Sequence, residues 1–222
     1  MSDIADILVE TAGRLIGDGL ARGAGGNVSA RDGELMLISP SGYSLEEATP
    51  ADYVHVSIAT GEIEAGENRP SSEVLMHLAI YRARPELEAV LHTHPPTAIA
   101  LTAAGHDLRP MYADYYVYLG RNVPHLAYVT VTTPELAAAV AAVARASDCY
   151  GIILRNHGAI TVGETIKEAY FRTLAIEEQA VIQQVALQVG DPVFLTDSEL
   201  DRLDHLGSEA YRRGLLARMR DR

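Results

Sequence analysis

The sequence predicts an α/β fold organised as one domain over residues 1–222. Hydrophobic residues make up 48% of the chain, which is enough for one sizeable core. Stretches in which apolar residues recur every three or four positions alternate with short apolar runs bounded by glycine, proline or serine. The first pattern is typical of amphipathic helices and the second of strands, so both kinds of element are expected in the same domain.

Composition restricts the classes of function. The formal net charge is −12, which disfavours nucleic acid and anionic membrane as partners, because both bind basic patches. Cys149 is the single cysteine, so no internal disulfide can form. The N-terminal segment has no basic leader pattern, and no apolar run reaches about 18 residues. We therefore expect a cytoplasmic protein, although acidity alone does not name its partner.

The first part of the chain predicts a helix followed by a hairpin. Apolar residues from Ile4 to Ile16 have helical spacing. A glycine-rich loop then leads into a strand over 28–31, and Asp32-Gly33 is a strong signal for the turn to a second strand over 34–38. The glycine-rich loop, and the small polar loop over 39–42, are either ordinary turns or cradles for an anion.

The remaining elements follow from the same patterns. Ser71 and Ser72 precede a helix and suit helix capping, although a helix N-terminus with two hydroxyls also suits an anion. Four tyrosines over 112–118 indicate an edge strand or an interface, or else one wall of a substrate pocket. Further strands are expected at 54–58, 87–94, 123–131, 151–155 and 159–162, and helices at 74–84, 96–104, 134–145, 165–188 and from about 198.

Two histidines end the strand over 87–94. His92 and His94 are two positions apart, so a strand directs both imidazoles to one side. His157 follows a second buried strand at a glycine turn. Three histidines plus an open coordination position are the ligand set of a catalytic metal site. Glu73, in the first turn of its helix, is a carboxylate available for proton transfer, or else a surface group favoured by the helix dipole.

Five motifs together resemble the class II aldolase/adducin family. They are Gly26-Asn27-Val28-Ser29-Ala30-Arg31, Ser39-Pro40-Ser41-Gly42, Pro70-Ser71-Ser72-Glu73, His92-Thr93-His94 and Asn156-His157-Gly158. They occur in the order and spacing of the family, over about residues 5 to 200. The resemblance implies three layers, α/β/α, around a mostly antiparallel sheet. It also implies a homotetramer with active sites at subunit interfaces.

The resemblance assigns roles to residues by position. It implies Zn²⁺ bound by His92, His94 and His157, with Mn²⁺ or Co²⁺ as alternatives because histidine binds all three metals. It makes Glu73 the acid/base. Tyr112 and Tyr211 lie near the positions of two family tyrosines, one of which donates a proton from the neighbouring subunit. The implied ligands of the substrate phosphate are Gly26, Asn27, Ser41, Gly42, Ser71 and Ser72.

The implied reaction cleaves or forms a carbon–carbon bond of a sugar phosphate, as in a ketose-1-phosphate aldolase. Its enediolate needs stabilisation by a Lewis acid, which the metal supplies, while Glu73 moves the proton at carbon. Lys167 is the only lysine and lies in a helix-capping sequence, which disfavours a Schiff-base mechanism. The alternative is a metal-dependent decarboxylase of the same superfamily. The non-enzymatic adducin branch lacks the metal ligands and is disfavoured.

Overall fold

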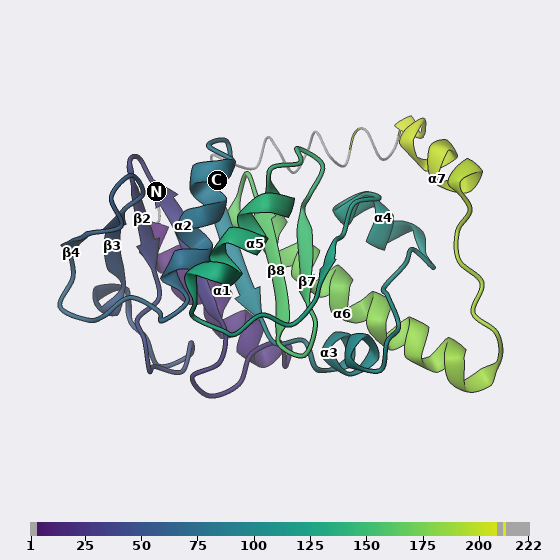
Figure 1. The fold of residues 1–222 in the computed structure, drawn as a ribbon, viewed down its shortest axis with the longest axis horizontal. Helices are drawn as coiled ribbons and strands as arrows, with labels where there is room; N and C mark the ends of the chain where they lie inside the picture. The colour runs from purple at the N-terminus through teal and green to yellow at the C-terminus, as the bar shows by residue number, and fades with distance from the viewer. Residues whose placement is uncertain (1–3, 208–210, 212–222) are drawn as a thin grey trace.

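The computed structural model describes residues 4–207 and residue 211. In this part of the chain, eight strands form one sheet in the order β4-β3-β2-β1-β5-β8-β7-β6 (Figure 1). Neighbouring strands are antiparallel except for β6 and β7, which are parallel. The strands are β1 (Asn27–Asp32), β2 (Leu35–Ile38), β3 (Val54–Ser57), β4 (Ile63–Ala65), β5 (Ala89–Thr93), β6 (His125–Leu126), β7 (Gly151–Leu154) and β8 (Gly158–Gly163).

Helices cover both faces of the sheet. Two of them, α2 and α5, cover the face turned toward the viewer in Figure 1, and α1 packs with part of α6 on the opposite face. The helices are α1 (Ile4–Gly17), α2 (Val74–Ala83), α3 (Pro96–Ala103), α4 (Ala113–Leu119), α5 (Pro134–Ala144), α6 (Ile166–Val189) and α7 (Asp197–Asp204), with a 3-10 turn, η1 (Pro50–Asp52). The expected α/β fold with a mostly antiparallel sheet is confirmed.

Successive side chains of β5 point to opposite faces of the sheet and so enter two different hydrophobic cores. Val90 points into the core beneath α2 and α5, whereas Ala89 and Leu91 point into the core beneath α1. All three side chains are fully buried, because β5 is a central strand with a neighbour on each side. His92, two positions after Val90, therefore faces the same layer as α2.

Hydroxyl caps begin the later helices. The Thr133 side chain accepts the backbone N–H of Leu136 at the start of α5, and Thr165 accepts that of Glu168 at the start of α6. Thr196 begins α7 with a full capping box: its side chain accepts the N–H of Glu199, and the Glu199 side chain accepts the N–H of Thr196. These caps satisfy N–H groups that have no partner within their own helix.

The structure corrects two expected elements. The tyrosine-rich segment is not an edge strand: it forms α4, in which Tyr115, Tyr116 and Leu119 are buried at helical spacing. The strand expected over 123–131 is reduced to the two residues of β6. β6 pairs only with the last two residues of β7, so the chain beyond Leu126 has no further partner strand to follow.

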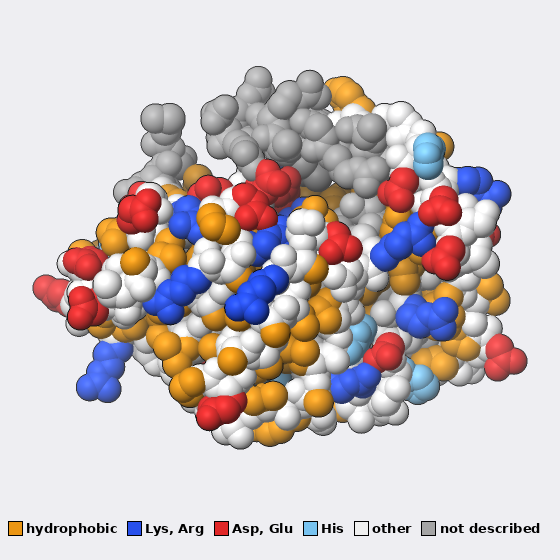
Figure 2. Space-filling model, turned by 45° about the horizontal axis from the view of Figure 1, so that its top comes forward, with side chains coloured by type: hydrophobic (Ala, Val, Ile, Leu, Met, Phe, Trp, Pro, Cys, Tyr) orange, Lys and Arg blue, Asp and Glu red, His pale blue; other side chains and the backbone are white. Residues whose placement is uncertain are grey.

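Charge is distributed over the surface without a basic patch on the face seen in Figure 2. Acidic and basic side chains alternate there with apolar ones. None of the helices in residues 4–207 combines the length and the apolar character that crossing a bilayer requires.

Candidate active site

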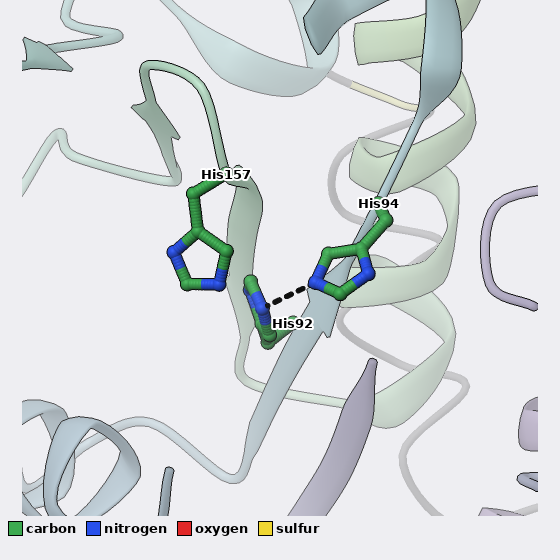
Figure 3. Close-up of side chains that lie close together, drawn as sticks. All are labelled: His92, His94 and His157. Carbon is green, nitrogen blue, oxygen red and sulfur yellow. Dashed lines mark hydrogen bonds between the residues drawn. The ribbon is translucent and has the colours of Figure 1, made fainter. Parts of the chain in front are cut away.

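The metal-site histidines come from two strand ends in the middle of the sheet. β5 pairs with β8 so that His92 lies opposite Ile160 and Thr93 opposite Ala159. His94 follows the last residue of β5, and its N–H donates to the Leu20 carbonyl. The Nε2 atoms of His92 and His94 lie 3.1 Å apart (Figure 3). The prediction that both rings point to one side is confirmed.

His157 enters from the turn between β7 and β8. Asn156 adopts a left-handed conformation, with φ of 58°, and the His157 N–H donates to the Leu154 carbonyl. Its ring centroid lies 4.7 Å from that of His92 and 5.5 Å from that of His94. The three rings converge on one space, as Figure 3 shows, and their nearest ligand atoms all lie within 4.8 Å of one another.

Gly158 makes this convergence possible. A Cβ atom at this position would lie 2.3 Å from the Thr93 carbonyl oxygen, 2.8 Å from Cδ2 of His94 and 3.1 Å from Cε1 of His92. Such contacts are too short for any side chain. The glycine of the Asn-His-Gly turn is therefore required because two histidine rings and a strand occupy the space beside it.

Hydrogen bonding fixes the nitrogen of His92 that faces the other two rings. Its Nδ1 lies 3.1 Å from the Ala159 carbonyl oxygen, which only accepts, so Nδ1 carries a proton and Nε2 is the nitrogen that can offer a lone pair to a metal. Burial is the largest of the causes that lower the pKa of His94 to about 4, so that ring is neutral at pH 7. Lone pairs that face each other need a cation between them, and a backbone partner on the second nitrogen is typical of metal-ligating histidine.

Glu73 completes the cluster. Its Oε2 lies 3.1 Å from Nε2 of His92, and its Oε1 lies 3.2 Å from Nε2 of His157. Burial raises the pKa of this carboxyl, but its contacts with His157, His92 and the N–H of Asn27 together lower it well below its ordinary range. A cation held by the imidazoles acts in the same direction. Glu73 is therefore a buried, ionised carboxylate next to the candidate metal ligands.

Two buried polar atoms of this cluster have no hydrogen-bond partner among the described residues: Oε1 of Glu73 and Nδ1 of His157. Buried polar atoms are nearly always paired in folded proteins. Orphan atoms beside three converging imidazoles fit a site whose remaining partners are a metal ion and a small molecule. The donor set, all imidazole nitrogen with a carboxylate at hand, suits Zn²⁺ and neighbouring divalent metals.

The three loops expected to bind phosphate are adjacent. Val28 on β1 accepts the N–H of Ser39 at 3.0 Å, and the carbonyl of Ser39 accepts the N–H of Ser71 at 3.0 Å. Between these bonds, Pro40 and Pro70 form an isolated antiparallel bridge. Loops that are distant in the sequence thus lie side by side, next to Glu73 at the start of α2.

The individual residues of these loops have different environments. Ser41, Gly42 and Ser72 are exposed, whereas Asn27 and Ser71 are buried. The Ser71 hydroxyl accepts the N–H of Glu73 at 3.3 Å, and Ser71 lies two residues before Glu73, the N-cap of α2. Gly26 has φ of 78°, and a Cβ there would meet the His92 carbonyl at 3.0 Å. Phosphate binding by these residues stays a prediction.

The tyrosines are not joined to the histidines by any hydrogen bond found among the described residues. The hydroxyl of Tyr112 donates to Glu178 on α6 at 2.7 Å, and Tyr211 is exposed. Their catalytic roles, which involve a neighbouring subunit for one of them, stay predictions. Lys167 lies on α6 with its ammonium 5.7 Å from the centre of the Phe171 ring, in a capping turn as expected.

A buried row of hydrogen-bonded polar side chains behind Glu73 was not predicted from the sequence. His77 and Tyr81 follow Glu73 at successive four-residue intervals on α2, and they alternate with Asn27 and Ser29 of β1 in a chain of hydrogen bonds. The four-residue spacing on a helix and the two-residue spacing on a strand are both visible in the sequence. The missing information was that α2 lies directly over β1.

Comparison with known proteins assigns the chain to a family. The profile described as Class II Aldolase and Adducin N-terminal domain matches residues 6–184. The chain is 36% identical to the 5-deoxy-D-ribulose 1-phosphate aldolase of Bacillus thuringiensis serovar kurstaki, over 86% of this chain and 88% of that protein. It is 34% identical to the 5-methylthioribulose-1-phosphate/5-deoxyribulose-1-phosphate aldolase of Rhodospirillum rubrum, over 88% and 87%.

A solved structure agrees with these sequence matches. L-fuculose 1-phosphate aldolase superimposes with a TM-score of 0.84 at 31% identity, covering 91% of this chain and 95% of that one. The protein therefore belongs to the class II aldolase and adducin family, and the resemblance drawn from the five motifs is confirmed.

Proposed function

We propose that this protein is a metal-dependent aldolase, a carbon–carbon lyase that cleaves a ketose 1-phosphate reversibly. The observation that carries the proposal is the convergence of three imidazoles beside an ionised carboxylate. Relatives named as aldolases of deoxyribulose phosphates and of fuculose phosphate support the substrate class. With the carbonyl at C2, cleavage breaks the bond between C3 and C4 and yields dihydroxyacetone phosphate and an aldehyde.

His92, His94 and His157 would hold the metal, and Glu73 would carry the proton at C3. A bound divalent cation supplies Lewis-acid stabilisation of the negative charge that develops beside the carbonyl. Glu73 accepts or returns a proton without leaving the site, because the Asn27 amide N–H holds its carboxylate beside the metal ligands. The loops at residues 26–27, 41–42 and 71–72 would bind the phosphate and orient the reacting carbons.

The proposal extends to metal, assembly and location. Zn²⁺ is the proposed ion, because neutral imidazole is a favoured zinc ligand, with Mn²⁺ or Co²⁺ as substitutes. A homotetramer with shared active sites is proposed, and the exposed apolar side chains of Val181, Val185 and Val189 on successive turns of α6 are consistent with a contact surface. We also place the protein in the cytoplasm as a single domain.

The test combines metal analysis with a substrate panel. Purified protein is assayed for bound zinc, manganese and cobalt. It is then supplied with 5-deoxyribulose 1-phosphate, 5-methylthioribulose 1-phosphate and L-fuculose 1-phosphate, with dihydroxyacetone phosphate measured by a coupled reduction. A β-keto acid in the same panel tests the decarboxylase alternative. Release of carbon dioxide without release of dihydroxyacetone phosphate from any sugar would refute the aldolase assignment.

A further inference from the structure

A buried polar row connects the candidate acid/base to the interior of the protein. Glu73, His77 and Tyr81 lie on one face of α2, four residues apart, and Asn27 and Ser29 lie on one face of β1, two residues apart. Helix and strand residues alternate along the row. All five residues are at most 8% exposed, so water does not compete for their hydrogen bonds.

The direction of each hydrogen bond follows from its neighbours. A carboxylate only accepts, so Asn27 donates from Nδ2 to Oε2 of Glu73, at 2.9 Å, and its Oδ1 must face His77. That oxygen lies 2.5 Å from Nε2 of His77, so Nε2 carries the proton. Burial lowers the pKa of His77 to about 3, and the ring is therefore neutral, with its lone pair on Nδ1.

The far end of the row fixes this tautomer. Nδ1 of His77 lies 2.7 Å from the Ser29 hydroxyl, which must donate to it. The Ser29 oxygen in turn accepts from the Tyr81 hydroxyl at 3.0 Å, while the Val90 carbonyl lies 3.5 Å away at the limit for a hydrogen bond. Every donor in the row therefore points toward Glu73.

We propose that His77 is a positioning residue, which holds the Asn27 amide in the orientation that donates to Glu73 and so fixes the acid/base carboxylate beside the metal ligands. Ser29 and Tyr81 act through His77: the Ser29 hydroxyl donates to Nδ1 of His77, which keeps the imidazole proton on Nε2, and Tyr81 donates to Ser29. The role resembles the hydrogen-bonded supports that orient side chains in other active sites, where small displacements reduce rate strongly. His77 itself does not touch the substrate.

Two substitutions separate positioning from simple packing. In His77→Gln, the amide nitrogen takes the place of Nε2 and still donates to Asn27. In His77→Asn, the shorter amide takes the place of Nδ1, keeps the bond with Ser29 and loses the one with Asn27. Both variants place an amide in the same buried position, so urea unfolding measures the structural cost that they share.

The expected kinetic result is a split between the two variants. His77→Gln should keep kcat within about threefold of the wild type, whereas His77→Asn should lower kcat on the order of 100-fold with bound metal unchanged, because a displaced catalytic group costs about that much. Equal kcat in the two variants, whether high or low, would overturn the proposal. This part of the test rests on the proposed aldolase function.

An NMR measurement does not depend on activity. In the wild type, the imidazole nitrogen spectrum should show His77 neutral with its proton on Nε2, and the Asn27 side-chain N–H₂ should exchange slowly with water. Slow exchange should persist in His77→Gln and be lost in His77→Asn. If the wild type cleaves no sugar phosphate but shows these signals, the proposed aldolase function is refuted and the hydrogen-bonded row is supported. A proton on Nδ1, or fast exchange in the wild type, refutes the row.

Discussion

Replacing Gly158 with alanine tests how closely the metal ligands are packed. The added methyl would lie 2.3 Å from the Thr93 carbonyl oxygen, whereas carbon and oxygen in contact lie about 3.3 Å apart. The turn must therefore move by about 1 Å relative to β5. The same methyl meets His94 at 2.8 Å and His92 at 3.1 Å, so both rings must shift as well.

The expected effects are large on the site and moderate on the fold. Overpacking a filled interior costs about 1–3 kcal/mol, and the free energy of unfolding should fall by that amount. Metal ligands must be held to within about 0.5 Å of their productive positions, so a shift of about 1 Å should weaken metal binding at least tenfold. Activity should fall on the order of 100-fold at metal concentrations that saturate the wild type.

The measurement is a zinc titration against a competing chelator, together with urea unfolding of the metal-free protein. Gly13→Ala is the matched control, because a Cβ at exposed Gly13 in α1 meets nothing within 4 Å. That control should stabilise the protein by about 0.5–1 kcal/mol through helix propensity and leave metal binding unchanged. A Gly158→Ala variant with wild-type affinity for zinc would refute the packing argument.

Three further predictions concern single side chains. Glu73→Gln should keep the metal and lose about 10²–10⁴ in kcat, and near-normal turnover in a metal-loaded sample would exclude the acid/base role. His157→Ala should lose both metal and activity, and stoichiometric tight metal in that variant would contradict the three-histidine site. Because burial depresses the pKa of His77 to about 3, the unfolded chain takes up a proton below about pH 6.5 that the folded chain refuses, so stability falls with pH. Between pH 7.5 and 5, metal-free wild type should lose about 2 kcal/mol more than His77→Gln, as measured by urea unfolding, and parallel losses would show that His77 is not buried and neutral.

The sequence predicted the histidine site because its geometry depends on local rules. Two-residue alternation on a strand places His92 beside His94, and a glycine turn after a second buried strand delivers His157. That the two parts meet followed from the resemblance, which implied one metal bound by all three histidines. The pairing of β5 with β8, which brings them together, was not predicted and is found in the structure. Nothing local shows that Gly158 is packed against both rings.

Other features required tertiary information. Tyrosine favours strands, whereas the spacing of Tyr115, Tyr116 and Leu119 is helical. The segment is a helix because this spacing allows all three side chains to be buried on one face of α4. The His77 row needed the register of α2 over β1, and a single sequence contains no such register. Expectations about the tyrosines at the active site depend on a second subunit and stay predictions.

The two borders of the sheet bear on how the protein behaves at high concentration. β4 has only three residues, all exposed, and Glu64 lies among them with Glu62 and Glu67 nearby; β6, on the other side, has two residues. Long unpaired borders invite strands from other molecules, whereas short or acidic ones repel them. The two ends of the sheet thus offer little free backbone for fibril-like stacking.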